Sequence, residues 1–107
     1  MNISIAPVDS ALHRVTIAGD LDLATASSLE RCLSDELATA HDVELDVTEL
    51  HFIDSTGIRA MVDALQRFSE SGRAFRLLGP LPAQMRRVLE VTGLLERFPV
   101  VNATSVA

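Results

Sequence analysis

The sequence contains no lysine, tryptophan or tyrosine, and it has a single cysteine. These absences and a net charge of −6 argue against a generic nucleic-acid-binding domain, which needs a basic face and often aromatic side chains that stack on bases. Cys32 cannot form an internal disulfide, which is typical of a reducing cytoplasm. No apolar run approaches the length of a membrane span, and the first ten residues lack the features of a signal peptide. We therefore expect a cytoplasmic protein that contacts neither nucleic acid nor membrane directly.

The 107 residues have the composition of a compact globular chain, with 48% hydrophobic residues, five glycines and four prolines. Nothing in the chain resembles a linker, a repeat or a low-complexity tract. We predict one domain over residues 1–107, with a core over about 2–101 and a loose C-terminal tail from residue 102. Charge is uneven: residues 1–54 hold eleven acidic residues and two arginines, whereas residues 55–107 hold four acidic residues and seven arginines. This asymmetry indicates a polarised interaction surface.

The hydrophobic pattern predicts an α/β fold. Strands are expected within residues 3–5, 12–18, 43–47, 74–78 and 97–101, and amphipathic helices within residues 23–40, 55–71 and 82–92. The order ββαβαβαβ implies right-handed crossovers and a small mixed, largely parallel sheet with helices against it. Within the third strand, apolar residues alternate with Glu44 and Asp46, so these acids are predicted to face a solvated rim.

Asp54, Ser55, Thr56 and Gly57 follow the third strand and begin the second helix. Unpaired backbone N–H groups and the positive end of the helix dipole meet at such a point and stabilise an anion. One of the first three residues is expected to cap the helix. Since one cap suffices, the pattern leaves two interpretations open: a simple helix start, or a helix start with a spare, modifiable hydroxyl group.

This segment, from Leu45 to Arg59, resembles the signature of the STAS domain family, and in particular of the stand-alone bacterial anti-sigma factor antagonists. Residues 17–26, which contain Gly-Asp-Leu-Asp, resemble the family's segment before the first helix. Residues 91–94 resemble its later turn, which ends in Gly-Leu. The likeness covers about residues 2–101, with the motifs in the same order and at matching spacing.

The resemblance implies a partner-switching regulator that is not an enzyme and has no catalytic residues, metal or cofactor. Ser55 matches the family's phosphoacceptor, and Thr56, which replaces a common second serine, is a lesser candidate. An anti-sigma factor that is also a serine kinase would bind the unmodified protein, free a sigma factor and phosphorylate Ser55; a serine phosphatase would restore the unmodified form. The docking positions that the resemblance implies are Asp20, Asp22, Asp54, Thr56, Gly57 and Ile58.

Two other functions are weighed against this one. The STAS-like chain could instead be a subunit of a lipid or anion transporter that binds a transport ATPase or a membrane domain. A small enzyme or nucleotide binder with an anion site at Ser55 is the third hypothesis, but the sequence places no general base beside that serine. The three histidines, His13, His41 and His51, lack the spacing of a helical metal site. The sequence leaves open the oligomeric state and the presence of a further C-terminal helix.

Overall fold

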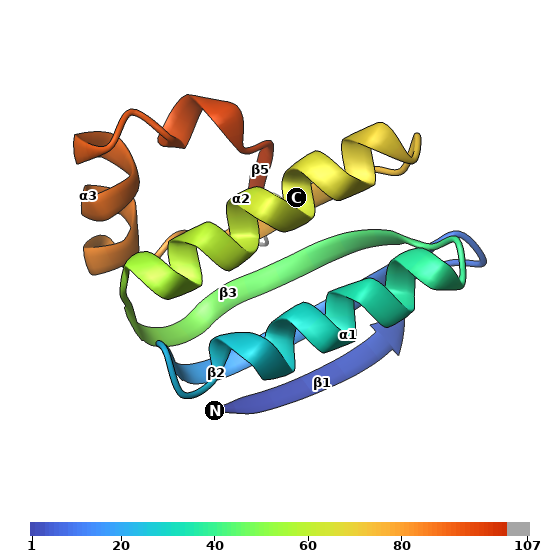
Figure 1. Cartoon of the computed structure of the whole chain (residues 1–107), viewed down its shortest axis with the longest axis horizontal. Helices are drawn as coiled ribbons and strands as arrows, with labels where there is room; N and C mark the ends of the chain where they lie inside the picture. Colours follow the sequence, from blue (N-terminus) through green and yellow to red (C-terminus); the bar gives the residue numbers. More distant parts are fainter. Residues whose placement is uncertain (103–107) are drawn as a thin grey trace.

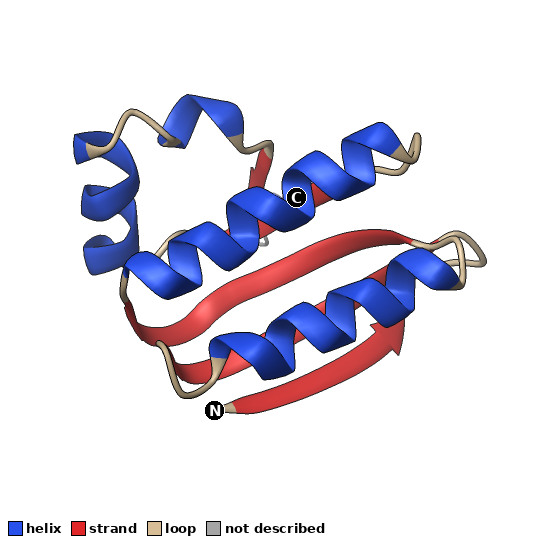
Figure 2. Ribbon diagram, in the orientation of Figure 1, coloured by secondary structure: helices blue, strands red, loops and turns tan. Residues whose placement is uncertain are grey.

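Five strands lie side by side in chain order, β1-β2-β3-β4-β5, in the computed structural model, which describes residues 1–102 (Figure 1). The elements follow one another as β1 (Asn2–Pro7), β2 (Leu12–Leu21), α1 (Ala26–Ala38), β3 (Asp42–Ile53), α2 (Ser55–Glu70), β4 (Phe75–Gly79), α3 (Ala83–Val91), the short 3₁₀ helix η1 (Leu95–Arg97) and β5 (Val100–Asn102). Helices α1 and α2 run across the front of the sheet, while α3 stands at one end of it (Figure 2). The predicted α/β class and element order are confirmed.

The sheet is mixed because its first connection is a tight turn and the later ones contain helices. Strand β1 pairs antiparallel with β2, and the carboxylate of Asp9 holds the turn by accepting the N–H groups of Ala11 and Leu12 at 2.8 Å each. Strands β2 to β5 pair in parallel, with a helix in every crossover. All carboxyl ends of the parallel strands therefore meet at one edge.

The core lies between the sheet and the apolar faces of α1 and α2. Alternate residues of β2, β3 and β4 are almost wholly buried, and the facing helices add their own apolar side chains. The strands contribute Val15, Ile17, Leu45 and Leu77, and the helices contribute Leu29, Leu33, Met61 and Phe68. Both helices are thus amphipathic, as their sequence spacing predicted. No helix within residues 1–102 is long and apolar enough to cross a membrane.

The two central strands extend further than the sequence pattern predicted. Strand β2 continues to Leu21 and β3 to Ile53, rather than ending near residues 18 and 47. Their pairing shifts register between Thr16 and Ala18 and again between Gly19 and Asp20. A bulge breaks the two-residue alternation on which strand prediction relies, so the bulged ends were invisible in the sequence.

The boundaries of other elements also differ from the prediction. Helix α1 begins at Ala26 rather than residue 23, because hydrogen bonds of Asp22 and Thr25 hold the preceding residues in a turn. Arg97 belongs to η1 rather than to the last strand, and Asn102 belongs to β5 rather than to the tail. The rest of the predicted tail, and any further helix, lies outside the described residues. The division into a core and a tail stays a prediction.

Glu44 does not face a solvated rim, so this expectation was wrong. Only 3% of the residue is exposed, and its carboxylate lies between two arginines of the neighbouring strands. Nε of Arg14 donates to one oxygen at 2.9 Å, and Nε and a terminal nitrogen of Arg76 lie 3.1 Å from the other. The charged row crosses the three central strands on the face opposite Val15 and Leu45. Burial of Glu44 is therefore compensated by two cations.

Helix α2 begins in direct contact with the end of β2. A Cβ at Gly57 would lie 2.7 Å from Cγ of Leu21, 2.8 Å from its carbonyl oxygen and 2.9 Å from Cγ1 of Ile53. Two of these atoms belong to buried side chains and one to a strand backbone, so none can move aside easily. Gly57 is required here for this close approach, which fixes the position of the first turn of α2.

Replacement of Gly57 by alanine should therefore destabilise the protein, although the same change in an open helix position would stabilise it. We expect Gly57→Ala to lower the free energy of unfolding by about 1–3 kcal/mol through overpacking, measured by urea denaturation. Ser69→Ala, at an exposed position of the same helix, is the control and should change stability little. A Gly57→Ala protein more stable than the wild type would contradict the close contact.

Candidate functional site

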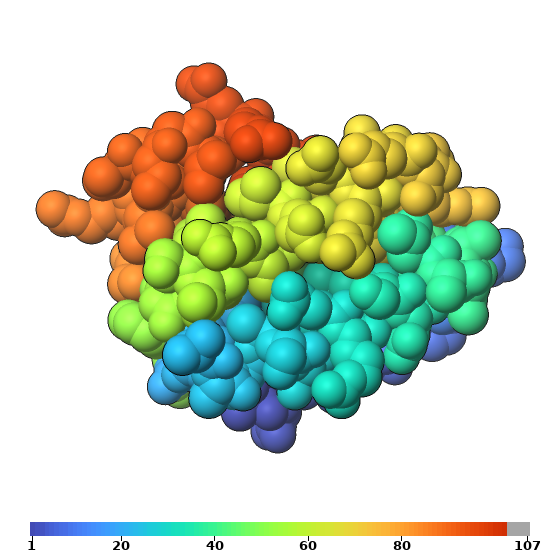
Figure 3. Space-filling view, in the orientation of Figure 1, coloured from blue at the N-terminus to red at the C-terminus, as the bar shows by residue number. Residues whose placement is uncertain are grey.

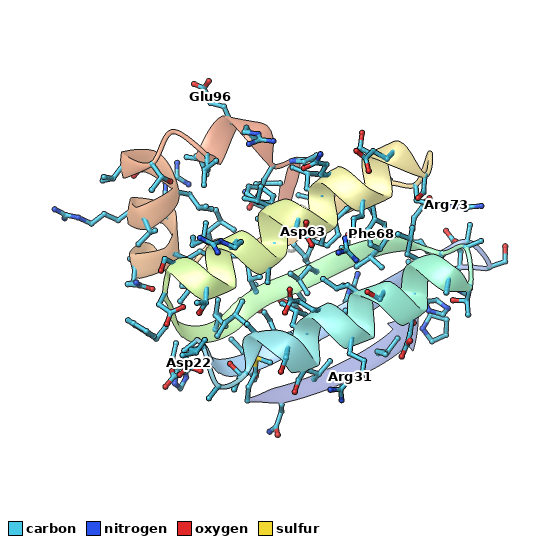
Figure 4. All side chains as sticks on the ribbon, in the orientation of Figure 1. Asp22, Arg31, Asp63, Phe68, Arg73 and Glu96 are labelled. Atoms are coloured by element: carbon cyan, nitrogen blue, oxygen red, sulfur yellow. The ribbon has the colours of Figure 1, made fainter. Side chains whose placement is uncertain are left out.

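The candidate site lies where the carboxyl ends of β2 and β3 meet the start of α2. The backbone N–H of Asp54 donates to the carbonyl oxygen of Leu21 at 3.2 Å, which joins the two strand ends. In the space-filling view, the segment before α1 and the first turn of α2 form one continuous surface at this end of the molecule (Figure 3). Asp22 projects from the same end (Figure 4). The fold thus brings together the two sequence motifs, which lie about thirty residues apart.

Asp54 is the residue that caps α2. Its carboxylate oxygen Oδ1 accepts the backbone N–H groups of Thr56 and Gly57 at 2.9 and 3.2 Å, and the hydroxyl group of Thr56 at 2.5 Å. The hydrogen bond from the hydroxyl group of Thr56 is the largest effect and lowers the pKa of Asp54. Desolvation opposes it, and hydrogen bonds from the backbone N–H groups of Gly57, Thr56 and Leu23 lower the pKa further. Asp54 therefore carries a negative charge at the start of the helix.

Ser55 is the first residue of α2 and is exposed. Within residues 1–102 its hydroxyl group makes no hydrogen bond, because Asp54 satisfies the helix start, whereas the hydroxyl group of Thr56 is bound to Asp54. The geometry thus separates two neighbouring candidates: Ser55 presents a free nucleophilic oxygen atom to solvent, and Thr56 does not.

The two acids before α1 have different environments. Asp22 shapes the loop: its carboxylate accepts the N–H of Ala24 at 3.0 Å and the hydroxyl group of Thr25 at 3.2 Å. The same hydroxyl group lies 2.8 Å from the carbonyl oxygen of Asp20. The Asp20 residue itself is exposed, and in the sheet it pairs with Phe52, two residues before Asp54. Both acids lie at the same edge of the sheet as Ser55.

Gly57 and Ile58, which the resemblance placed in the docking surface, are both buried. Ile58 is 7% exposed and packs in the core, and Gly57 contacts Leu21. These residues hold the surface in place from beneath it, and the side chains around them provide the exposed groups.

Sequence reasoning missed Gln84, which anchors α3 to the end of β3. Its side-chain amide donates to the carbonyl oxygen of Ile53 at 2.9 Å and accepts the N–H of the same residue at 3.1 Å. This reciprocal pair fixes the backbone directly before Asp54. A glutamine on the polar side of a predicted helix gives no sequence signal of such a role.

Two exposed apolar side chains near the site were also missed. Leu23 is 78% exposed in the loop before α1, and Phe52 is 45% exposed near the end of β3. An exposed leucine and phenylalanine beside exposed acids are typical of a surface that another protein covers. In the sequence, each of these two residues is apolar at a position where the strand or helix pattern calls for a polar one.

The arrangement can carry or bind an anion, but it is not built to activate a nucleophile. Within residues 1–102, no histidine or carboxylate hydrogen-bonds to the hydroxyl group of Ser55. No general base is therefore in contact with this hydroxyl group. The one group of three potential metal ligands in that part of the chain does not include any of the predicted site residues. The site is thus suited to modification by another protein.

The lowered pKa of Asp54 predicts how stability depends on pH. A carboxyl group whose pKa is lower in the folded state stabilises the fold above its unfolded pKa, about 3.9, and this contribution is lost as pH falls through the folded pKa. Asp54→Asn should retain the cap but lose this titration. We expect the stability advantage of the wild type over Asp54→Asn, measured by urea denaturation, to shrink as pH falls from 6 to 3. An advantage that grows toward low pH would contradict the assignment.

Comparison with known proteins supports the fold and identifies the family. Residues 6–107 match the family model described as the STAS domain. The chain is 27% identical to an anti-sigma-B factor antagonist of Staphylococcus epidermidis, over 99% of both chains. It superposes on the anti-sigma factor antagonist SpoIIAA in its unphosphorylated form with a TM-score of 0.81 and 18% identity, covering 97% of this chain and 90% of that one.

A second structure, the Bacillus cell fate determinant SpoIIAA in the phosphorylated form, has a TM-score of 0.76 and 20% identity, covering 97% of this chain and 93% of that one. At these identities the superpositions establish the fold, while the family match extends over nearly the whole chain, including both motifs at the site. The chain therefore belongs to the STAS domain family.

Proposed function

We propose that this chain is an anti-sigma factor antagonist whose binding to an anti-sigma factor is switched by phosphorylation of Ser55. The proposal rests on the different roles of two neighbouring residues at the start of α2. Asp54 caps the helix, and Ser55 keeps an exposed hydroxyl group. The names of the relatives, which are anti-sigma-B factor antagonists at 26–27% identity, support the class of partner. Such a protein acts by binding, so the proposal assigns it no catalytic activity, metal or cofactor.

The proposed docking surface combines acidic and apolar groups around Ser55. Asp20 and Asp54 contribute negative charge, and Leu23 and Phe52 contribute exposed apolar area. A complementary partner would offer basic side chains beside an apolar pocket, since charge complementarity guides association and buried apolar groups supply affinity.

Phosphorylation at Ser55 would change this surface without changing the fold. A phosphate adds about −1.5 to −2 charges at neutral pH. The helix N-terminus and Arg59, one turn later and exposed, partly offset that charge in the free protein. In the complex, the phosphate would be desolvated beside the carboxylate of Asp54, and like-charge contacts at an interface cost several kcal/mol. The modification would thus act on binding rather than on folding.

The proposal names two further partners by their chemistry. An anti-sigma factor with serine kinase activity would transfer phosphate from ATP to Ser55, and a serine phosphatase would hydrolyse that phosphoester. Both reactions require access to the hydroxyl group, which the exposure of Ser55 provides. Because these reactions take place inside the cell, the cytoplasmic location predicted from the sequence is part of the same proposal.

The phosphoacceptor can be identified by incubating the protein with candidate anti-sigma kinases and ATP, then mapping the product by mass spectrometry. We expect one phosphate, on Ser55, because the hydroxyl group of Thr56 is bound to Asp54. Ser55→Ala should accept none. Phosphate on Thr56 in the wild type would contradict the assignment, and stable copurification with a transport ATPase without phosphorylation would favour the transporter-subunit alternative.

The effect of charge at Ser55 can be measured by titrating variants against the anti-sigma factor that binds the wild type. Ser55→Ala should bind about as tightly as the unmodified wild type. Ser55→Asp should bind roughly a hundredfold more weakly if the added charge costs about 3 kcal/mol at the interface. Ser69→Asp adds the same charge at the exposed far end of α2 and is the control. Equal affinities of Ser55→Ala and Ser55→Asp would refute the switch.

A further inference from the structure

A second cluster of functional side chains lies at the opposite end of the sheet from Ser55. His13 at the start of β2, Glu36 in the last turn of α1 and His41 in the loop before β3 each offer one potential ligand atom, and these atoms all lie within 4.8 Å of one another. Arg73, which pairs with Asp42 next to His41, is at the end of the molecule opposite Asp22 (Figure 4). The spacing of the histidines in the sequence gave no indication of this cluster.

His13 contacts both of the other side chains. Nδ1 of His13 lies 2.5 Å from Oε1 of Glu36, and the rings of His13 and His41 stack with centroids 3.7 Å apart and an interplanar angle of 19°. Glu36 is 8% exposed, whereas both histidines are partly exposed. The cluster thus combines one buried carboxylate with two partly exposed imidazole rings.

The ring of His41 hydrogen-bonds to Thr39 at the C-terminus of α1. The hydroxyl group of Thr39 lies 3.1 Å from the carbonyl oxygens of Asp35 and Glu36 and 2.9 Å from Nδ1 of His41. The hydroxyl group of Thr39 can donate its single proton to a carbonyl oxygen and accept the Nδ1–H of His41. In that tautomer Nε2 of His41 has an unshared electron pair, as in a histidine that an outer hydrogen-bond partner orients for metal binding.

The backbone also holds His41 in place. Ala40 adopts φ +62°, a left-handed conformation that is uncommon for a residue with a Cβ. The N–H of His41 donates to the carbonyl oxygen of Glu36 at 3.1 Å, which folds the loop back over the end of α1. The N–H of Ala40 donates to the carbonyl oxygen of Leu37 as well, so Ala40 and His41 cap the C-terminus of α1.

Electrostatics at this point favours an added cation. Glu36 places a negative charge in the last turn of α1, where the helix dipole is also negative, and this turn contains no basic residue. Within residues 1–102, the only cationic partner of the Glu36 carboxylate is His13, which is charged only when protonated. Arg73 is directed to Asp42, at 3.9 Å.

We propose that His13, Glu36 and His41 form a binding site for a divalent transition metal, with Zn²⁺ as the reference ion. Two imidazole nitrogens and one carboxylate oxygen are a donor set that zinc accepts, with water in the remaining position. The metal would take the place of the proton that His13 shares with Glu36, and that proton would be released to solvent. The site would tie α1, β2 and the loop before β3 together.

Binding requires a rearrangement of the cluster, in which the His41 ring leaves both His13 and the hydroxyl group of Thr39. With Zn–N and Zn–O bonds of about 2.0–2.1 Å, ligand atoms in a tetrahedral site are about 3.3 Å apart, so the separation between His13 and Glu36 must grow by about 0.8 Å. The His41 ring must leave the stack so that its Nε2 electron pair points at the ion. Rotation about χ1 and χ2 is available to it, because His41 lies in a loop and is partly exposed.

Zinc binding can be tested by calorimetry and thermal unfolding on tag-free protein. We expect one Zn²⁺ per chain and, at about a hundred times the Kd, a rise in Tm of about 10 °C or more. Mg²⁺ should produce no such shift, because it prefers oxygen ligands. Co²⁺ should give visible absorption bands of a four-coordinate site with nitrogen and oxygen ligands, and the NMR signals of the His41 ring should lose the shift caused by stacking on His13.

Variants separate this site from weak surface binding. His41→Asn should lower zinc affinity at least about tenfold and keep its fold, because the side chain is partly exposed and lies in a loop. Glu36→Gln should have a similar effect on affinity, with folding checked by circular dichroism. His51→Asn, at an exposed position of β3, removes the remaining histidine and is the matched control.

The outcomes divide clearly. Stoichiometric binding that His41→Asn weakens and His51→Asn leaves unchanged supports the site. Absence of binding in the wild type, equal affinity in wild type and His41→Asn, or a loss of binding in His51→Asn would each overturn it. None of these results depends on Ser55 or on an anti-sigma factor, so the proposed function and the metal site are tested separately.

Discussion

The first turn of α2 lies against the end of β2 at a distance that only glycine permits, because a Cβ at Gly57 would be 2.8 Å from the carbonyl oxygen of Leu21. A hydrogen bond from the N–H of Asp54 to the same oxygen joins the two strand ends. Gln84 then holds Ile53, the preceding residue, through both of its backbone polar groups. The exposed hydroxyl group of Ser55 is thus presented by backbone that is fixed on three sides, which suits a surface that a partner must recognise in one shape.

The buried ion row on the other face of the sheet makes a similar contribution to the body of the fold. Glu44 on the central strand binds Arg14 on one neighbour and Arg76 on the other, so three parallel strands are held in register by charge as well as by backbone hydrogen bonds. Loss of either arginine would leave a buried carboxylate with half of its compensation. Such a row is specific for register, because a shift by one residue would move Glu44 into the apolar layer.

Much of the fold could be predicted from the sequence, since helix and strand periods are local and the core residues repeat with them. The exceptions arise where distant segments decide the structure. Strands β2 and β3 continue past their bulges as far as the site, so their ends were predicted too early. A bulge depends on the pairing of two distant strands, so the local sequence pattern does not reveal it. Glu44 looked like a solvated residue because its two partners lie about thirty residues away on either side. The contacts of His13 with His41 likewise depend on a crossover, so spacing along the chain could not reveal them.

Helix α1 connects the two ends of the molecule without making them one site. Its first residues follow the end of β2 with Asp20 and the loop with Asp22, and its last turn carries Glu36. An ion bound at Glu36 would stabilise the whole helix against the sheet, because helix formation is cooperative. A phosphate on Ser55 would act differently: the cap belongs to Asp54, so the added charge replaces no hydrogen bond that holds the fold. Metal binding would therefore change the stability of the protein, and phosphorylation would change only its surface. The two proposed events could thus occur independently.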